Sequence, residues 1–194
     1  MYDVIIIGGG PTGASAAMFT ARAGLTTLVV DANRGVTKRA MVNNHLGLTA
    51  GMAGPDLVAA GRMQAEQAGS TWLPETAANL TDGPGGILMV HTEAGTTVAG
   101  RAVILATGFT HALAETAGIE LTQATEPRVP QIVAVDAAGH TSRPGVWAAG
   151  TIGGTSVHTI ITAGDGARVA INLISELRGE RHVDHDLLPA PDAQ

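Results

Sequence analysis

Three glycines near the N-terminus have the spacing of a dinucleotide-binding loop. Gly8, Gly10 and Gly13 form a Gly-x-Gly-x-x-Gly pattern directly after the apolar run at residues 4–7. Glycines at this spacing allow a tight turn, let the backbone approach a pyrophosphate closely, and let the following helix pack against its strand. The chemistry predicted for this loop is therefore the binding of a pyrophosphate at a helix N-terminus.

An acidic residue follows the loop at the distance that ribose recognition requires. Asp31 ends the next apolar run, residues 27–31. A carboxylate there can accept hydrogen bonds from ribose hydroxyls, whereas it would repel a phosphorylated ribose. A glycine pattern alone is weak evidence, since merely structural turns share it. The ordered series of strand, glycine loop, helix, strand and acid is much stronger, and it favours FAD or NAD over NADP.

This chemistry needs a parallel sheet to position it. Residues 3–7 and 27–31 read as buried strands and residues 11–23 as the helix between them, which together make a βαβ unit. Further strands are predicted at residues 101–106, 131–135 and 145–149, further helices at residues 56–68 and 110–118, and a long helix within residues 155–177. Short alternating segments at residues 71–73, 77–80, 87–92 and 96–98 are separated by turns. From these segments we expect a three-stranded antiparallel β-meander. Residues 121–130 are expected to be a connecting loop.

Composition narrows the class of protein. The chain has 194 residues, of which 45% are hydrophobic and 14% charged, as in a globular protein. We expect one domain over residues 1–180 and a polar C-terminal tail over residues 181–194. Eleven basic and seventeen acidic residues give a net charge of −6 without a basic cluster, which argues against a nucleic-acid partner.

The sequence also lacks cysteine and a long apolar run near its N-terminus. There is no cysteine, so a disulfide, a thiolate metal site and a redox-active cysteine pair are all excluded. The apolar run near the N-terminus is too short for a signal peptide or a membrane span, which predicts a cytoplasmic protein with no membrane partner. His182 and His185 have a spacing that can bind a metal, but acidic neighbours in a polar tail favour a solvated segment, and no metal site is predicted.

Three other segments carry a resemblance to a known family. Residues 102–108, Ala-Val-Ile-Leu-Ala-Thr-Gly, resemble a strand end of the flavin-dependent pyridine nucleotide-disulfide oxidoreductases. Residues 143–150, Arg-Pro-Gly-Val-Trp-Ala-Ala-Gly, and then residues 161–167 resemble the C-terminal FAD segment of the thioredoxin reductase family. Residues 43–48, Asn-Asn-His-Leu-Gly-Leu, resemble that family's loop beside the flavin ring. The resemblance implies a Rossmann-like FAD-binding domain of the α/β class.

The resemblance also implies that a domain is missing. The matches fall in family order into two blocks, residues 1–110 and 128–178. Relatives carry an NADPH-binding domain between these blocks, but here only a short linker, residues 109–128, joins them. That linker has no second glycine pattern and no Cys-x-x-Cys. We therefore do not expect this chain alone to reduce a disulfide by the family's usual route.

The family pattern implies how FAD is held. The pyrophosphate would lie on the glycine loop, Asp31 would hold the adenosine ribose, the backbone of Ala77 would contact the adenine, and Gly150 with Thr151 would lie under the ribityl chain. The predicted cofactor-binding residues are Gly8, Gly10, Pro11, Thr12, Gly13, Asp31, Asn44, Ala77, Thr107, Gly108, Gly150, Thr151 and His158.

The chain departs from the family at positions that matter for chemistry. Thr151 stands where the family has an Asp that bonds the cofactor, so FAD affinity is in question. His158 stands where the family has a Gln, and its imidazole either hydrogen-bonds the isoalloxazine or serves the helix or the core. His45 either donates a proton at the flavin face or forms part of the pocket wall, and Asn44 is placed at the N5/O4 edge of the flavin. His158 and His45 are the candidate catalytic residues.

Three functions follow from these observations. The first is an FAD-dependent oxidoreductase that takes electrons from a separate reductase, another redox protein or a small-molecule substrate. The second is a non-catalytic or regulatory FAD-binding subunit of a larger assembly. The third is a degenerate NAD-binding fold that holds no flavin. The family resemblance also implies a homodimer.

Overall fold

The predicted βαβ unit forms the centre of the molecule. In the computed structural model, which describes residues 1–188, β1 (Tyr2–Ile7) pairs in parallel with β2 (Thr27–Val30), and Ile7 lies opposite Val30. The crossover helix α1 (Pro11–Arg22) has a proline in its first turn, where a missing N–H costs nothing. The chain leaves α1 at Gly24, whose φ of +81° is a conformation that favours glycine.

One long strand joins the parallel sheet to the meander. The sequence suggested two segments at residues 96–98 and 101–106, but β8 (Thr97–Leu105) is continuous. One edge of β8 pairs with β1, and the other pairs first with β7 (Leu88–Thr92), antiparallel, and then with β11 (Val146–Ala148), parallel. The meander β6 (Ala77–Asp82), β7 and β8 is therefore an extension of the central strand.

The remaining elements correct two expectations. β5 (Thr71–Leu73), a candidate meander strand by its sequence, pairs in parallel with β2 at the edge of the main sheet. β9 (Leu121–Gln123) pairs antiparallel with β10 (Gln131–Val133), so the expected loop at residues 121–130 is wrong in its first part. The other elements are η1 (Val36–Arg39), β3 (Met41–Val42), β4 (Met52–Ala53), α2 (Gly54–Gln67), η2 (Pro84–Gly86), α3 (Ala112–Thr116), η3 (Gly150–Gly153) and α4 (Thr159–Arg178).

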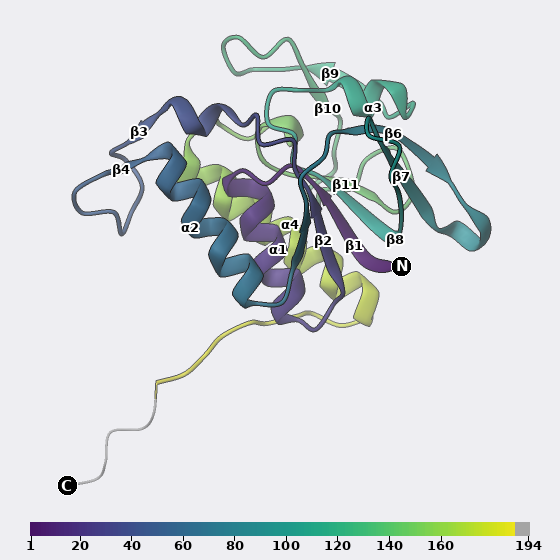
Figure 1. The fold of residues 1–194 in the computed structure, drawn as a ribbon, viewed down its shortest axis with the longest axis horizontal. Coiled ribbons are helices and arrows are strands. Elements are labelled where there is room, and N and C mark those ends of the chain that lie inside the picture. Colours follow the sequence, from purple (N-terminus) through teal and green to yellow (C-terminus); the bar gives the residue numbers. More distant parts are fainter. Residues whose placement is uncertain (189–194) are drawn as a thin grey trace, which may run out of the picture.

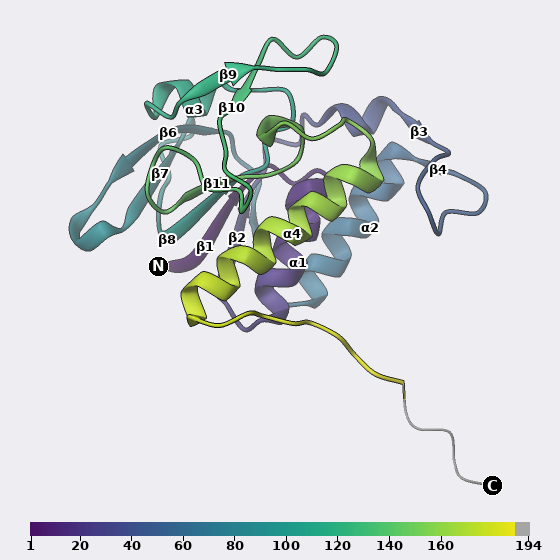
Figure 2. The ribbon, with the colours of Figure 1, turned by 180° about the vertical axis from the view of Figure 1, so that it is seen from behind.

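Two apolar cores lie on the two faces of the sheet, because strand residues alternate between faces. Val4 and Ile6 of β1 face the core beneath α1, α2 and α4, the three helices that lie side by side in Figures 1 and 2. Ile5 and Ile7 face the opposite core, which the meander and α3 cover. The layers are thus helices, parallel sheet, and meander with α3, which confirms the predicted α/β class with a three-stranded meander.

The long helix expected within residues 155–177 is α4. Gly154 has a φ of +93° and ends η3, and His158 occupies the N-cap position, so the helix begins at Thr159. Beyond α4, Arg22 of α1 forms salt bridges of 2.8 and 2.7 Å with Asp184 and Asp186. The first part of the predicted tail therefore packs against α1, and residues 189–194 of that prediction lie outside the described part. In residues 1–188, every helix is too short or too polar to span a lipid bilayer.

Candidate functional site

A cavity of about 510 Å³ opens at the carboxyl ends of the central parallel strands. Ile7 and Val30, the last residues of β1 and β2, line it together with Ala106, which directly follows β8. This edge is where open α/β sheets bind their ligands, because the loops that leave the strands diverge there. The cavity volume is in the range of small-molecule and cofactor sites.

The glycine loop forms one wall of the cavity, and each of its glycines has a separate structural reason. Gly8 has a φ of +105°, and a Cβ there would lie 2.5 Å from the carbonyl oxygen of Ala106. A Cβ on Gly13 would lie 1.8 Å from the carbonyl oxygen of Gly8, so Gly13 allows α1 to pack directly behind the loop. A Cβ on Gly10 would meet nothing within 4 Å, so the backbone there stays open to the cavity.

The same wall presents the N-terminus of α1. The N–H of Ala14 donates to the carbonyl oxygen of Gly10 over 2.9 Å, and the N–H groups before it have no intrahelical partner. Such groups, with the partial positive charge of the helix end, bind anionic groups such as phosphates. The open backbone at Gly10 and the N–H groups of α1 therefore form a cradle that fits a pyrophosphate.

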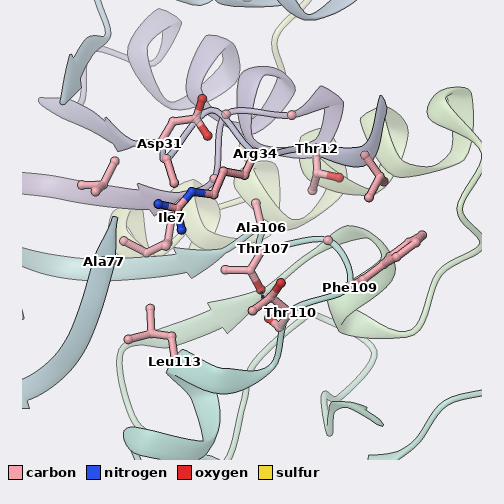
Figure 3. Close-up of a pocket in the computed structure, with 18 of the residues that line it drawn as sticks. Ile7, Thr12, Asp31, Arg34, Ala77, Ala106, Thr107, Phe109, Thr110 and Leu113 are labelled. Atoms are coloured by element: carbon pink, nitrogen blue, oxygen red, sulfur yellow. Dashed lines mark hydrogen bonds between the residues drawn. The ribbon is translucent and has the colours of Figure 1, made fainter. Parts of the chain in front are cut away.

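Acidic and small residues form one end of the cavity. Asp31 holds its place through its backbone N–H, which donates to the carbonyl oxygen of Leu73 over 3.0 Å. Its carboxylate lies against Gly9, where a Cβ would come within 2.8 Å of the carboxylate oxygen. Thr76, Ala77 and Glu93 line the same cavity from the meander. Figure 3 shows Asp31 and Ala77 on opposite sides of this end.

Residues from β8 onward form the other end. The hydroxyl of Thr107 donates to the carbonyl oxygen of Thr110 over 2.6 Å, which closes a short turn that places Gly108 and Phe109 at the cavity (Figure 3). Thr151, only 4% exposed, completes this end from η3. The two ends together make an elongated site with the glycine loop between them.

A buried carboxylate holds the segment that contains Thr151. Asp165 of α4 is 8% exposed, and its carboxylate accepts the backbone N–H of Gly150 over 2.7 Å. The same carboxylate accepts a hydrogen bond from Nε–H of Arg168 over 2.8 Å. Because the accepted hydrogen bond is charge-assisted and buried, Asp165 fixes the backbone at Gly150 and so positions Thr151.

The structure brings most of the predicted cofactor residues together. Those that line the cavity are Gly8, Gly10, Pro11, Thr12, Asp31, Ala77, Thr107, Gly108 and Thr151. Gly13 and Gly150 lie behind this lining, where Gly13 packs on Gly8 and Gly150 packs on Thr12. Asn44, His45 and His158 are not part of it.

The two candidate catalytic histidines lie at the beginning of α4. Nδ1 of His45 is 3.0 Å from the hydroxyl of Thr159, and Nδ1 of His158 is 2.9 Å from the hydroxyl of Ser156. Val157 and Thr162, on either side of this helix start, line the cavity. The histidines are thus beside the cavity and not in its wall, and their catalytic role stays a prediction.

Sequence reasoning missed three charged residues of the site: Arg34 and Glu93, which line the cavity, and Asp165, which holds Gly150. Arg34 lines the cavity from the loop after β2, and its only signal in the sequence is its closeness to Asp31. Asp165 was visible as an acid inside an otherwise small and apolar helix segment, a pattern that indicates a buried carboxylate with a partner. Within residues 1–188, no group of three His, Asp or Glu side chains is arranged to hold a metal ion.

The family comparison agrees with this geometry. A family model described as pyridine nucleotide-disulphide oxidoreductase matches residues 2–125. The chain belongs to this family. The match covers the glycine loop, Asp31, the meander and the Thr107–Gly108 turn, and membership of the family implies FAD as the cofactor. The cradle at Gly10 and the carboxylate of Asp31 fit the pyrophosphate and ribose of that cofactor.

Curated relatives that match the chain are thioredoxin reductases. The chain is 41% identical over 113 residues to thioredoxin reductase of Streptomyces clavuligerus, a match that covers 56% of this chain and 35% of that protein. It is 38% identical over 125 residues to thioredoxin reductase of Listeria monocytogenes, covering 62% of this chain and 38% of that protein. The matched part thus spans little more than a third of these relatives.

Solved structures show the same fold. A thioredoxin reductase from Gloeobacter violaceus aligns with a TM-score of 0.81 at 19% identity, covering 96% of this chain and 99% of that chain. The atypical thioredoxin reductase TRi from Desulfovibrio vulgaris Hildenborough aligns with a TM-score of 0.81 at 20% identity, covering 93% and 99%. The chain is a thioredoxin reductase-like FAD domain in its fold.

Proposed function

We propose that this chain is an FAD-dependent oxidoreductase that receives its electrons from a separate donor, either a reductase or a small molecule. The single observation that carries the proposal is the elongated cavity, with a pyrophosphate cradle at its middle and an acid at one end. FAD bound there would supply a two-electron carrier. Gly8, Gly10 and Thr12 would hold its pyrophosphate, and Asp31 its adenosine ribose.

The need for a separate donor is supported by the middle of the chain. Between β8 and β10 the described structure contains only α3 and β9, and β9 is used to pair with β10. This passage is far shorter than a nucleotide-binding domain. The chain also has no cysteine that could receive electrons. We infer that residues 109–128 stand in place of an NADPH domain and that residues 1–180 form one domain.

Protons for such a reaction would come from the edge of the cavity. At the end formed by Thr107–Thr110, Thr151 and Val157, none of the lining side chains among residues 1–188 is a histidine or a carboxylic acid. His45 and His158 lie next to this end and are the proposed proton donors. If they act so, the variants His45→Ala and His158→Ala will retain FAD and lose turnover, with no change in thermal unfolding.

The second candidate function is a non-catalytic, regulatory FAD-binding subunit. The observation that favours it is the same lack of titratable side chains in the wall beside Thr151. The two functions differ in one measurement. A regulatory subunit would bind FAD, yet no donor or acceptor added in excess would change the flavin spectrum at a catalytic rate.

The first experiment is a visible absorption spectrum after incubation with FAD and removal of the free cofactor. A retained flavin spectrum supports the proposal, and anaerobic mixing with NADH, NADPH, dithiols or a purified reductase then identifies the donor. A colourless protein would contradict the proposal and would favour the third function, a dinucleotide fold without flavin.

We further propose that the chain forms a homodimer in the cytoplasm. The family resemblance supports the dimer, and the acidic net charge of −6 with no membrane-spanning helix in residues 1–188 is compatible with this location. Light scattering on a size-exclusion column tests the assembly. A mass near 19.6 kDa, that of one chain, would contradict it.

A further inference from the structure

Arg34 is the cation of the cavity. Among the described residues that line it, the charged side chains are Asp31, Arg34 and Glu93, and only Arg34 is positive. A dinucleotide brings a doubly negative pyrophosphate into this cavity, beside the two carboxylates. The N–H groups at the N-terminus of α1 already offer positive partial charge to that pyrophosphate, so Arg34 is the cation left to contact another part of the ligand.

The position of Arg34 is specific within the cavity. It lies in the loop after β2, three residues beyond Asp31, and this loop faces the first residues of β6. In Figure 3 its side chain reaches from the loop into the end of the cavity that lies between Asp31 and Ala77. That is the end where the adenosine of a dinucleotide belongs if Asp31 accepts from its ribose, as the proposed function has it.

The side chain is also available for a ligand. Within residues 1–188, the guanidinium of Arg34 takes part in no salt bridge and no hydrogen bond, even though Asp31 and Glu93 line the same cavity. By contrast, four other arginines each form a salt bridge with a carboxylate of the chain: Arg62, Arg101, Arg143 and Arg168. A planar guanidinium without a partner is suited to lie on the face of a heteroaromatic ring.

We propose that Arg34 is a specificity residue that covers the adenosine half of the bound dinucleotide and stacks its guanidinium on the adenine ring. The proposal rests on the proposed function for its ligand, since it takes FAD as the occupant. It adds that affinity depends on the adenosine half as well as on the flavin. It also predicts that ADP, which has the adenosine and the pyrophosphate but no flavin, binds by itself.

The test compares three probes on four proteins. Dissociation constants are measured for FAD by flavin fluorescence and for ADP and riboflavin by calorimetry. The proteins are the full chain, Arg34→Ala, Arg34→Lys and the matched control Arg39→Ala, which removes an exposed arginine of the nearby η1 that does not line the cavity. Circular dichroism confirms that every variant is folded.

We expect Arg34→Ala to weaken FAD and ADP about tenfold each, which is about 1.4 kcal/mol. Riboflavin has no adenine, so its affinity should not change. Arg34→Lys should recover little, because an ammonium has the charge but not the plane. Arg39→Ala should bind all three probes as the unaltered chain does.

The outcomes separate the two proposals. If the unaltered chain binds ADP but not FAD, and Arg34→Ala weakens ADP, the proposed function fails and the role of Arg34 stands. If FAD binds and Arg34→Ala binds FAD and ADP unchanged, the role of Arg34 is refuted and the function stands. Full recovery in Arg34→Lys would refute stacking. Binding of neither probe by the unaltered chain would overturn both.

Discussion

Replacing Gly10 and Gly13 by alanine should separate two roles that one glycine pattern combines. At Gly13 the new methyl group would lie 1.8 Å from the carbonyl oxygen of Gly8. The oxygen belongs to the backbone and the methyl group is bonded directly to Cα, so α1 or the loop must move by more than an ångström. At Gly10 the methyl group would meet nothing within 4 Å, and the backbone φ of −70° suits alanine.

The magnitudes follow from these contacts. Overpacking a rigid interior costs about 1–3 kcal/mol, and Gly13→Ala should fall at the upper end because no side chain can give way. A loss of about 3 kcal/mol lowers Tm by about 6–12 °C in a domain of this size. Gly10→Ala destabilises the fold because alanine is a poorer N-cap residue than glycine, and stabilises it because alanine reduces the entropy of the unfolded chain. Each effect changes the free energy of unfolding by less than about 1 kcal/mol, and the two are opposite in sign. Its Tm should stay nearly unchanged.

The assay is thermal unfolding of the cofactor-free protein, followed by FAD titration. Gly10→Ala should unfold normally but bind FAD at least about tenfold more weakly, because its methyl group fills the space that a pyrophosphate needs. Gly13→Ala should lose stability before any cofactor is added. Equal Tm losses in the two variants, or unchanged FAD affinity in Gly10→Ala, would refute the assignment of the cradle.

Two other predictions concern charged groups away from the glycine loop. Asp165→Ala should lower the free energy of unfolding in urea by about 2–4 kcal/mol, because it leaves the N–H of Gly150 without its charged acceptor. Asp165→Asn should recover part of this loss. Equal losses in the two variants would contradict the role of the hydrogen bond to Gly150. His140 lies between two carboxylates, with its ring nitrogens 2.9 Å from Asp136 and 2.6 Å from Glu176. Partial burial lowers the pKa of His140, but the hydrogen bonds to Glu176 and Asp136 outweigh it and raise the pKa above 6.5. The stabilisation by this histidine is therefore complete below pH 6.5 and is lost as the pH rises through the higher folded-state pKa. The difference in urea unfolding between the unaltered chain and His140→Gln should shrink from pH 6 to pH 9, and a difference that grows would contradict this sign.

The sequence predicted the sheet well where local signals were strong. The run of residues 3–7, the glycines after it and the run ending at Asp31 are contiguous, so periodicity and turn chemistry alone identified the βαβ unit. Strand partners were harder to predict. Residues 71–73 and 96–98 have similar alternating patterns, yet one joins β2 in parallel and the other begins β8, because pairing is decided by contacts far apart in the chain.

The site shows the same division between local pattern and long-range contact. The glycine pattern and Asp31 were recognisable because their spacing reflects the ligand they hold. Arg34 and Asp165 were not recognised, because nothing in an isolated arginine or in a single helical acid tells which cavity or backbone group it will face.

Pattern and composition by themselves determined the α/β class, the pyrophosphate loop and the absence of any thiol chemistry, since each depends on residue types within a few positions of one another. Only the tertiary structure decided that Thr151 and Arg34 line one cavity and that Asp165 reaches Gly150. It also placed His45 and His158 beside the cavity and not in its wall. These placements depend on how α4 packs against α1 and on where the loop after β2 lies, and such distances are set by side-chain packing between segments far apart in the chain.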